Sequence, residues 1–485
     1  MTSPGALFGN LWHRLSPRAG VIIGTPWHGR QAAEFNTLST LFATSSKAGV
    51  PQLALDYLDG KPVPFACTVA DVDERAFVVM CALDQACMNI HPAYPTRLSS
   101  SGRPLGAMLA GMKADRTRSG CYSDVTGVGI VVPKGHLTKP AFPSDGEEAS
   151  GSDISHQFTS LTMVPHPRTG RSLRFVTPSP SKFSLTDGDG VDKVGFAPIA
   201  EDRDDLVFST CDRGSSPYLD TRPSSAISSR MAEVVESLLD RGAGTILLPE
   251  LVADHISLQE LRRRLSSRSG GKTALIVCGS GASSIVDPAT GRPHNEAVVM
   301  TADGRVLGQQ RKLHLFRMAA SRMKECAIDC EPGHENRGHI EDAAAGQELI
   351  VYDLFGLGRV MVLICEDLQQ SDPGGDTALA SRPDWILTPV LDVPQEVGRW
   401  THQRAYEIGR KTYSRVVVSC SATLGVRQRS AAKLSDCPDI AIGVCMDGFA
   451  SNKVHLIKSD CVSTPHTVLF DWNGPDWKKT RIEAR

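Results

Sequence analysis

The stretch Arg359-Val-Met-Val-Leu-Ile-Cys365-Glu366-Asp367 decides how the C-terminal part of this chain is interpreted. Its apolar, β-branched run is typical of a buried strand, and a cysteine followed by two acidic residues ends that run abruptly. A thiol at the end of a core strand is a common position for a nucleophile, but a buried cysteine is also an ordinary small hydrophobic residue. On its own, the stretch favours a cysteine that only packs in the core. A catalytic cysteine becomes the better interpretation if a basic group and a cationic side chain lie at the ends of other strands.

The overall composition excludes several classes of protein. The 485 residues allow two or three domains at roughly 150 residues each. A formal net charge of −2 gives no electrostatic reason to expect nucleic acid or an anionic membrane as a partner. No apolar run approaches the roughly 18 residues that span a bilayer, and the N-terminus has no apolar signal core. The 13 cysteines show no regular spacing, which favours reduced thiols and a cytoplasmic location.

The sequence of the N-terminal part indicates a separate module, in which no catalytic or binding motif is recognised. Residues 1–140 are interpreted as an unassigned globular module, α/β or α+β, whose role stays open between binding, regulation, oligomerisation and others. Apolar residues at helical spacing predict a helix over 32–48. Strands are predicted within 52–69, over 76–83 and over 127–132. Residues 141–190 are rich in turn formers and predict an irregular linker, with a possible strand over 173–176.

Residues 191–485 show a more regular pattern, in which strands alternate with helices. Strands are predicted at 194–198 or 206–210, and at 245–248, 274–277, 297–300, 305–307, 349–353, 360–364, 385–390 and 416–419. The turn Thr301-Ala-Asp-Gly304 predicts a hairpin between two of them. Helices are predicted over 227–239 and 397–411. Alternating strands and helices with occasional hairpins indicate a layered α/β domain with mixed sheets.

Three reactive residues follow predicted strands of this domain. Glu250 comes after the strand at 245–248, Lys312 comes just after the hairpin, and Cys365 ends the opening stretch. Together they form a complete set for acyl transfer. A carboxylate takes the thiol proton, the thiolate attacks a carbonyl or nitrile carbon, and an ammonium group stabilises the thiolate and the oxyanion.

The order and context of these residues resemble the nitrilase, or carbon–nitrogen hydrolase, superfamily. The resemblance covers roughly residues 190–480 and none of the first 190. It is carried by Asn295-Glu-Ala-Val-Val-Met-Thr-Ala-Asp-Gly-Arg-Val-Leu-Gly-Gln-Gln-Arg-Lys-Leu-His-Leu-Phe316, Gly346-Gln-Glu-Leu-Ile-Val-Tyr-Asp-Leu-Phe-Gly356, Arg404-Ala-Tyr-Glu407 and Arg415-Val-Val-Val418. It implies an α-β-β-α sandwich with mixed sheets. It also implies that Glu250 is the general base, Lys312 the cationic stabiliser and Cys365 the nucleophile that forms a thioester.

The same resemblance implies further site residues. The backbone N–H of Glu366 is expected to complete the oxyanion site, and His314 is expected to be a structural neighbour of the lysine. Family members also use a second glutamate between the lysine and the cysteine. We prefer Glu341 for this role because it precedes the Ala-Ala-Ala-Gly346 segment that resembles the family's loop before the cysteine strand. The other candidates are Glu325, Glu331 and Glu335.

Two departures from the family pattern concern the neighbourhood of the cysteine. Most members have an aromatic or small residue where this chain has Glu366. Cys-Glu-Asp does occur in glutamine-dependent NAD synthetases, but their Ser-Gly-Gly-x-Asp-Ser loop is not matched here, because Ser269-Gly-Gly-Lys-Thr273 lacks the aspartate. The second departure is the long separation of Lys312 and Cys365, which lie 53 positions apart (312 to 365).

The stretch between lysine and cysteine contains Cys326, Cys330, His334 and His339, a set that could hold a tetrahedral zinc ion. We prefer a loop that is merely rich in cysteine and histidine, because the spacing is not the usual one and the family that the chain resembles needs no metal. No metal and no cofactor are therefore expected.

The sequence predicts a cytoplasmic thiol hydrolase of a non-peptide C–N bond, with an amide as the favoured substrate. Its expected partners are a small-molecule substrate and further copies of itself in a homo-oligomer, with no nucleic acid and no membrane. Two alternatives stay open. One is an acyltransferase that uses the same thioester, and the other is a catalytically weak nitrilase-fold binding or scaffold subunit. The identity of the substrate is not encoded in any single residue.

Overall fold

The computed structural model describes residues 2–23, 29–92, 105–136, 154–185, 192–212, 216–268, 273–330, 332–433, 440–448, 453–459, 468–473 and 476–480. The chain forms two compact units. The N-terminal unit comprises Met1–Arg168, Phe175–Thr177 and Thr377–Pro383, and the C-terminal unit comprises Thr169–Arg174, Pro178–Asp376 and Asp384–Arg485. In the described part of the chain, no helix has an apolar stretch long enough to cross a membrane.

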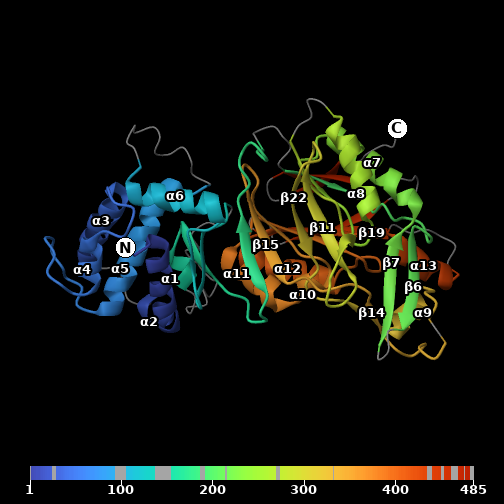
Figure 1. The fold of residues 1–485 in the computed structure, drawn as a ribbon, viewed down its shortest axis with the longest axis horizontal. Coiled ribbons are helices and arrows are strands. Elements are labelled where there is room, and N and C mark those ends of the chain that lie inside the picture. Colours follow the sequence, from blue (N-terminus) through green and yellow to red (C-terminus); the bar gives the residue numbers. More distant parts are fainter. Residues whose placement is uncertain are drawn as a thin grey trace. The chain divides into compact units, whose positions relative to one another are not determined.

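The N-terminal unit is a helical cluster with a small antiparallel sheet, drawn mainly in blue and cyan in Figure 1. Its central helix is α5, which contacts α1, α3 and α4. The helices are α1 (Pro4–Leu15), α2 (Ala19–Ile23), α3 (Gly29–Thr44), α4 (Gln52–Leu58), α5 (Val72–Cys87) and α6 (Ala107–Ser119), and the strands are β1 (Ser123–Val125), β2 (Gly129–Pro133) and β3 (Leu161–Pro165). The predicted helix over 32–48 and the predicted strand over 127–132 are confirmed as α3 and β2.

Two strands predicted in this unit are wrong, because the segments are helical. The run at 76–83 lies inside α5, and the first part of 52–69 is α4. The side chain of Asp71 accepts hydrogen bonds from the backbone N–H groups of Asp73 and Glu74, so it caps the start of α5. Since consecutive residues of α5 are buried, its apolar run has no helical periodicity and looks like a buried strand.

The stretch predicted as an irregular linker, 141–190, contains regular structure. Its described residues include β3 and β4 (Ser172–Val176), so the predicted strand at 173–176 is confirmed and the irregular interpretation is wrong there. In β4, Leu173 and Phe175 are buried and alternate with exposed neighbours, which is the period-two pattern of a strand. The predicted domain boundary near residue 190 stays a prediction.

The C-terminal unit contains two large mixed sheets and several helices. The first sheet has the order β10-β11-β9-β8-β5-β21-β22 with β12 beside β11, and the second has the order β20-β19-β18-β17-β16-β15-β4. The first sheet consists of β5 (Lys193–Phe196), β8 (Thr245–Leu247), β9 (Leu275–Val277), β10 (Gly281–Val286), β11 (Pro293–Thr301), β12 (Val306–Arg311), β21 (Val468–Asn473) and β22 (Asp476–Thr480). The second contains β15 (Glu348–Leu354), β16 (Gly358–Val362), β17 (Trp385–Val390), β18 (Arg415–Cys420), β19 (Ile440–Asp447) and β20 (Val454–Ser459) as well as β4. The helices are α7 (Ser225–Asp240), α8 (His255–Ser266), α9 (Ala320–Glu325), α10 (Glu366–Gln369), α12 (Trp400–Thr412) and α13 (Thr423–Ala431), whereas α11 (Asp376–Ser381) belongs, from Thr377 on, to the N-terminal unit.

These elements stack in four layers. The two large sheets face each other, since the ring of Phe196 on β5 lies against Gly443 on β19. On the outer face of the first sheet, α7 and α8 lie side by side, and Met231 of α7 shares one apolar cluster with Ile246 of β8 (Figure 1). On the second sheet, α12 packs against β18 and β19. The expected α-β-β-α sandwich with mixed sheets is confirmed.

A third, four-stranded sheet was not predicted. Its order is β13-β14-β7-β6, with β6 (Leu206–Asp212), β7 (Pro217–Pro223), β13 (Arg317–Met318) and β14 (His339–Glu341). We call it the small sheet. It joins a hairpin that precedes α7 to two short strands from the stretch between Lys312 and Cys365. Because β13 and β14 have only two and three residues, they show no alternation that a sequence pattern can reveal.

A buried ion pair ties two strands of the second sheet together. Arg359 Nε on β16 donates to Asp353 Oδ1 on β15 at 2.8 Å, and both residues are buried. The backbone N–H of Arg359 also donates to Asp384 Oδ2 at 2.6 Å. A buried charge that loses its partner is costly, because neither water nor a counter-charge solvates it.

We expect Arg359→Met to lower the free energy of unfolding of the C-terminal unit by about 3–5 kcal/mol, because Asp353 is left buried without its cation. Urea titration measures this change. The control is Arg174→Met, which removes the exposed pair of Arg174 with Glu348 and should change the value by no more than about 1 kcal/mol. Equal effects of the two substitutions would contradict the assignment.

Candidate active site

Three strand ends of the sandwich place Glu250, Lys312 and Cys365 in one buried cluster. Glu250 follows β8 and Lys312 follows β12, both in the first sheet, whereas Cys365 follows β16 in the facing second sheet. Their exposed fractions are 2%, 1% and 4%. The structure therefore brings together the three residues that the sequence selected, although they are far apart along the chain.

The ammonium group of Lys312 lies between two carboxylates. Lys312 Nζ is 2.7 Å from Glu250 Oε1 and 2.6 Å from Glu341 Oε2. Glu341 is on β14 of the small sheet, and its Oε2 also accepts a hydrogen bond from the backbone N–H of Phe316 at 3.3 Å. Of the candidates for the second glutamate that the structure describes, Glu341 is thus the one beside the lysine.

The other glutamate candidates lie elsewhere or are not described. Glu325 forms an ion pair with Arg322 at 3.2 Å, and Glu335 accepts from the backbone N–H of Gly333 at 3.0 Å. Glu331 lies outside the described residues.

Asn295 is a site residue to which sequence reasoning assigned no role. Its Nδ2 donates to Glu250 Oε1 at 3.0 Å and to Glu341 Oε1 at 2.6 Å, so one amide holds both carboxylates. The other oxygen of Glu250 accepts from the backbone N–H of Leu391 at 2.9 Å. The signal for Asn295 was its place at the start of the run that resembles the family, but that run does not reveal its partners.

Cys365 lies at a strained turn between strand and helix. Its φ is +48° and its ψ is −106°, in a region that non-glycine residues rarely adopt. Such a conformation costs on the order of 1–3 kcal/mol and persists where surrounding contacts hold it. Here the backbone N–H of Cys365 donates to Pro389 O at 2.9 Å. Burial, and next the nearby carboxylate of Glu250, raise the pKa of its thiol. The turn therefore holds the cysteine at the edge of the charged cluster.

Burial and the neighbouring charges shift the pKa of Cys365, Glu250 and Lys312. Burial raises the pKa of the Cys365 thiol well above its ordinary value, and the nearby Glu250 raises it further. Burial also raises the pKa of Glu250, although Lys312 opposes this effect. For Lys312, burial acts to lower the pKa, but attraction to Glu250 and Glu341 outweighs it and raises the pKa well above the ordinary value. These shifts favour the protonated thiol of Cys365 and the protonated amine of Lys312, and they make the Glu250 carboxylate a stronger base than usual.

Asp367 ties the cysteine turn to the lysine loop. Its Oδ1 accepts from the backbone N–H of His314 at 2.8 Å and from His314 Nδ1 at 3.0 Å, and the N–H of Leu313 donates to it as well, at 3.0 Å. Arg171 Nη1 lies 2.8 Å from His314 Nε2, and Arg171 Nη2 donates to Leu313 O at 2.7 Å. Since a guanidinium only donates, His314 Nε2 accepts and Nδ1 carries the proton. His314 is thus bound as a structural neighbour of Lys312.

Glu366 directs its side chain along its own helix. Its Oε1 accepts from Gln370 Nε2 at 2.6 Å, and the residue is only partly buried. Its backbone N–H begins α10, directly after the nucleophile. The expected oxyanion role of that N–H stays a prediction.

A small cavity opens beside the cluster. It encloses about 30 Å³ and borders the three charged residues of the cluster. Its full lining is Leu219, Thr221, Glu250, Leu251, Lys312, Phe316, Met318, His339, Glu341 and Leu391.

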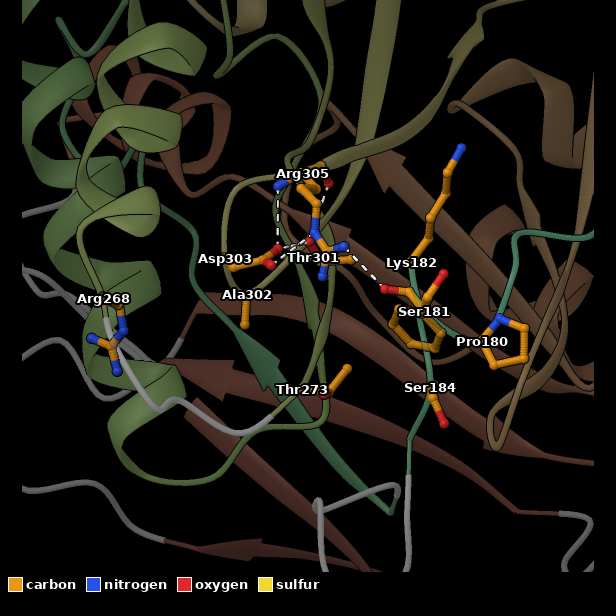
Figure 2. Close-up of a pocket in the computed structure, with 11 residues that line it drawn as sticks. Pro180, Ser181, Lys182, Ser184, Arg268, Thr273, Thr301, Ala302, Asp303 and Arg305 are labelled. Atoms are coloured by element: carbon orange, nitrogen blue, oxygen red, sulfur yellow. Dashed lines mark hydrogen bonds and ion pairs between the residues drawn. The ribbon is translucent and has the colours of Figure 1, made fainter.

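A second hollow, of about 190 Å³, lies at the turn between β11 and β12 and is shown in Figure 2. Thr301, in its lining, is six residues along β11 from Asn295, which is roughly 20 Å in an extended strand. There Arg305 is held by Asp303 at 2.8 Å and by the carbonyl of Ser181 at 3.1 Å. This hollow is not part of the cluster.

Three of the four residues considered for zinc contact other groups, and the ring centroids of His334 and His339 lie 6.3 Å apart. Cys330 Sγ lies 3.9 Å from Met323 Sδ, His334 Nε2 lies 3.5 Å from Asp212 Oδ2, and His339 Nδ1 lies 3.0 Å from Arg337 O. Within the described ranges, no group of three or more His, Cys, Asp or Glu side chains is arranged to hold a metal ion.

Of three comparisons with known proteins, the one with solved structures finds similar chains. No family model matches the chain, and no curated protein matches it. A Saccharomyces cerevisiae member of branch 10 of the nitrilase superfamily is 15% identical, with 57% of this chain and 88% of that chain covered and a TM-score of 0.37. A Nesterenkonia AN1 amidase from the nitrilase superfamily is 12% identical, with 60% and 93% covered and a TM-score of 0.36. A glutamine-dependent NAD+ synthetase from Acinetobacter baumannii is 17% identical, with 57% and 45% covered and a TM-score of 0.36. The roles of Glu250, Lys312 and Cys365 therefore depend on the contacts within this chain.

We expect Asp367→Asn to lower the free energy of unfolding by about 2–4 kcal/mol, because an amide replaces a buried, charged acceptor of several hydrogen bonds. Urea titration measures the change. As a control, Asp240→Asn alters an exposed carboxylate paired with Arg268 and should leave stability within about 0.5 kcal/mol of wild type. If Asp367→Asn were equally mild, Asp367 would not be the tie between the two loops.

Proposed function

We propose that this chain hydrolyses a non-peptide C–N bond, most simply that of an amide, through a thioester on Cys365. One observation supports the proposal: Cys365, Glu250 and Lys312 are buried together at three strand ends, and Glu250 Oε1 lies 2.7 Å from the Lys312 ammonium nitrogen. The Glu250 carboxylate is also close enough to Cys365 to add to the rise that burial causes in the pKa of its thiol. In space, the proposed nucleophile Cys365 is thus beside the proposed base Glu250, which is beside the cation Lys312. The expected resemblance to carbon–nitrogen hydrolases points to the same chemistry.

In the first half-reaction, the Glu250 carboxylate accepts the thiol proton while the sulfur of Cys365 attacks the substrate carbonyl carbon. The negative charge that develops on the carbonyl oxygen is stabilised by the Lys312 ammonium group and, we propose, by the backbone N–H of Glu366. Glu250 then gives its proton to the nitrogen, the C–N bond breaks, and the amine or ammonia leaves. The product is a thioester between the acyl group and Cys365.

In the second half-reaction, Glu250 takes a proton from water, whose oxygen attacks the thioester carbon. The C–S bond breaks, the thiolate regains the proton, and the carboxylic acid leaves. Glu341 does not exchange protons in this scheme. It holds Lys312 in place and raises the pKa of Glu250, so we propose a positioning and electrostatic role for it.

The two alternatives differ from the hydrolase in the fate of the thioester or in whether it forms. An acyltransferase would pass the acyl group to an acceptor other than water. Adding hydroxylamine and comparing hydroxamate with free acid measures this partition. A scaffold subunit would form no thioester. The cluster favours the enzyme, since burying the charged Lys312 and Glu250 is costly and gives a scaffold no benefit. A cytoplasmic location, a small-molecule substrate and a homo-oligomer belong to the same proposal.

We expect Cys365→Ala to lower ammonia release from amides by about 10⁴-fold or more, because no other group in the cluster can form the acyl intermediate. Intact mass should show an acyl adduct on the wild type and none on this variant. The control is Cys67→Ala, which changes an exposed cysteine and should leave turnover unchanged. Full activity of Cys365→Ala would disprove the mechanism.

The pH dependence of kcat/KM tests the role of Glu250 as the base. Activity requires the ionised carboxylate, so it should fall as the pH drops through the raised pKa of Glu250, which lies above its ordinary 4.5. Glu341→Gln removes a negative charge that raises this pKa. The acid limb of the profile should therefore move to lower pH in Glu341→Gln. An acid limb that stays in place or moves to higher pH would contradict the assignment.

A further inference from the structure

We propose that Asp392 and Arg399 are positioning residues for the proposed hydrolysis: their ion pair fixes the strand end that supports both Cys365 and Glu250, and it controls how reactive the Cys365 thiol is. This inference rests on the proposed function and adds to it two residues that exchange no protons and form no bond with the substrate. It is drawn from the end of β17 and from the loop that follows this strand.

The end of β17 supports the proposed nucleophile and the proposed base together. Pro389 O accepts a hydrogen bond from the backbone N–H of Cys365 at 2.9 Å. Val390 O accepts from the backbone N–H of Glu250 at 3.5 Å, and the N–H of Leu391 donates to Glu250 Oε2 at 2.9 Å. Three consecutive residues thus hold one reactive residue from each of the two large sheets. A shift of this strand end would therefore change the distance between the sulfur and the carboxylate, on which the reaction rate depends.

Asp392, the next residue along the chain, anchors this strand end. Arg399 Nη2 donates to Asp392 Oδ1 at 2.7 Å and to Oδ2 at 2.8 Å, and Trp400 Nε1 donates to Oδ2 at 2.9 Å. The carbonyl oxygen of Asp392 accepts from the thiol of Cys420 on β18 at 3.3 Å. Several donors on one carboxylate fix its direction as well as its distance. Asp392 is thus tied to the beginning of α12 and to the neighbouring strand.

The ion pair is partly buried, so water screens its charges less than those of a surface pair. The side chains of Asp392 and Arg399 are 15% and 21% exposed. The charged side chains that act on the thiol of Cys365 lie on separate elements, with Glu250 after β8, Lys312 after β12 and Asp392 after β17. Burial and Glu250 raise the pKa of the thiol, Lys312 lowers it, and Asp392 raises it. The charge of Asp392 therefore reaches the nucleophile, and Arg399 is the counter-charge that opposes this effect.

The two halves of the pair should affect the thiol in opposite directions. Removal of the Asp392 charge leaves the Arg399 guanidinium near the thiol, which favours the thiolate. Removal of Arg399 leaves the Asp392 carboxylate without its counter-charge, which disfavours the thiolate. A pair that only held the loop in place would behave differently, because the loss of either partner would loosen the same contacts and expose Cys365 in both cases. The direction of the change in thiol reactivity therefore distinguishes the two roles.

The experiment measures the rate at which iodoacetamide alkylates Cys365 in the full-length protein at neutral pH, from the mass of the peptide that contains it. We expect Asp392→Asn to raise this rate by about 3-fold or more and Arg399→Met to lower it by a similar factor, because the rate follows the fraction of thiolate. Arg399→Lys keeps the positive charge and should stay closer to the wild type than Arg399→Met does. A change in the same direction in Asp392→Asn and Arg399→Met, or no change in either, would overturn the proposal.

Ammonia release from the amide that the wild type turns over fastest tests the positioning role. Asp392→Asn and Arg399→Met should each lower kcat by about 10-fold or more and leave KM within about 3-fold of wild type, because the end of β17 places the reacting groups and does not bind the substrate. A wild-type kcat in both variants would contradict the role. If Arg399→Met does not fold, Asp392→Asn decides alone, since slower alkylation or an unchanged kcat in that variant would overturn the proposal.

Glu236→Gln and Arg264→Met are the matched controls. They remove a pair of similar exposure, in which Arg264 Nε lies 3.2 Å from Glu236 Oε1 and the side chains are 29% and 21% exposed. This pair joins α7 and α8 on the outer face of the first sheet. Neither control should change the alkylation of Cys365 or the kcat. Effects as large as those of Asp392→Asn and Arg399→Met would mean that the loss of any ion pair has this result, and the proposal would fail.

The remaining outcomes separate this inference from the proposed function. If the wild type hydrolyses amides but the two variants do not move the alkylation rate in opposite directions, the inference fails and the hydrolase assignment stands. If the wild type releases no ammonia and forms no acyl adduct, while the alkylation rates do move in opposite directions, the hydrolase proposal fails and the control of the thiol by the ion pair is upheld. If neither result is obtained, both proposals fail together.

Discussion

The buried ammonium group of Lys312 between Glu250 and Glu341 is the interaction on which the rest of the site depends. One cation neutralises only one of two carboxylates in a place that water barely reaches, so the remaining charge needs other donors. Asn295 and the backbone N–H groups of Leu391 and Phe316 supply them. Because these donors come from separate strands and loops, the charge cluster couples the first sheet to the small sheet.

The nucleophile is joined to this cluster from the opposite sheet. Cys365 adopts a positive φ at the end of the β16 segment, and Asp367, two residues later, binds the loop that follows Lys312. The same short segment thus carries the reactive sulfur and the contact that fixes its distance from the cation. Arg171 extends this contact through His314, so a residue from outside the region of family resemblance supports the lysine loop.

A helix or strand could be predicted from the sequence only where its apolar residues form a run or recur with a regular period over a sufficient length. Many strands of the sandwich and the helices α7 and α12 were predicted, because buried β-branched runs alternate with helical apolar spacing. Residues 76–83 of helix α5 were predicted as a strand because nearly all of them are buried, which removes the helical periodicity. The small sheet was missed for another reason: pairing between remote segments, rather than local alternation, makes β13 and β14 strands.

The sequence by itself determined many strands of the two large sheets, although not β10 and β19 to β22. It also determined the selection of Glu250, Lys312 and Cys365, since each lies at a strand end in a recognisable local pattern. Tertiary structure alone decided which partners these residues have. Glu341 was one of four glutamates in a stretch without periodicity, and only its pairing beside Leu219 brings it to Lys312. Asn295 and Asp367 likewise acquire their roles from distances across strands and loops, which local sequence does not encode. Charge neutralisation and close packing act between residues that are neighbours in space, and those neighbours exist only once the sheets have formed.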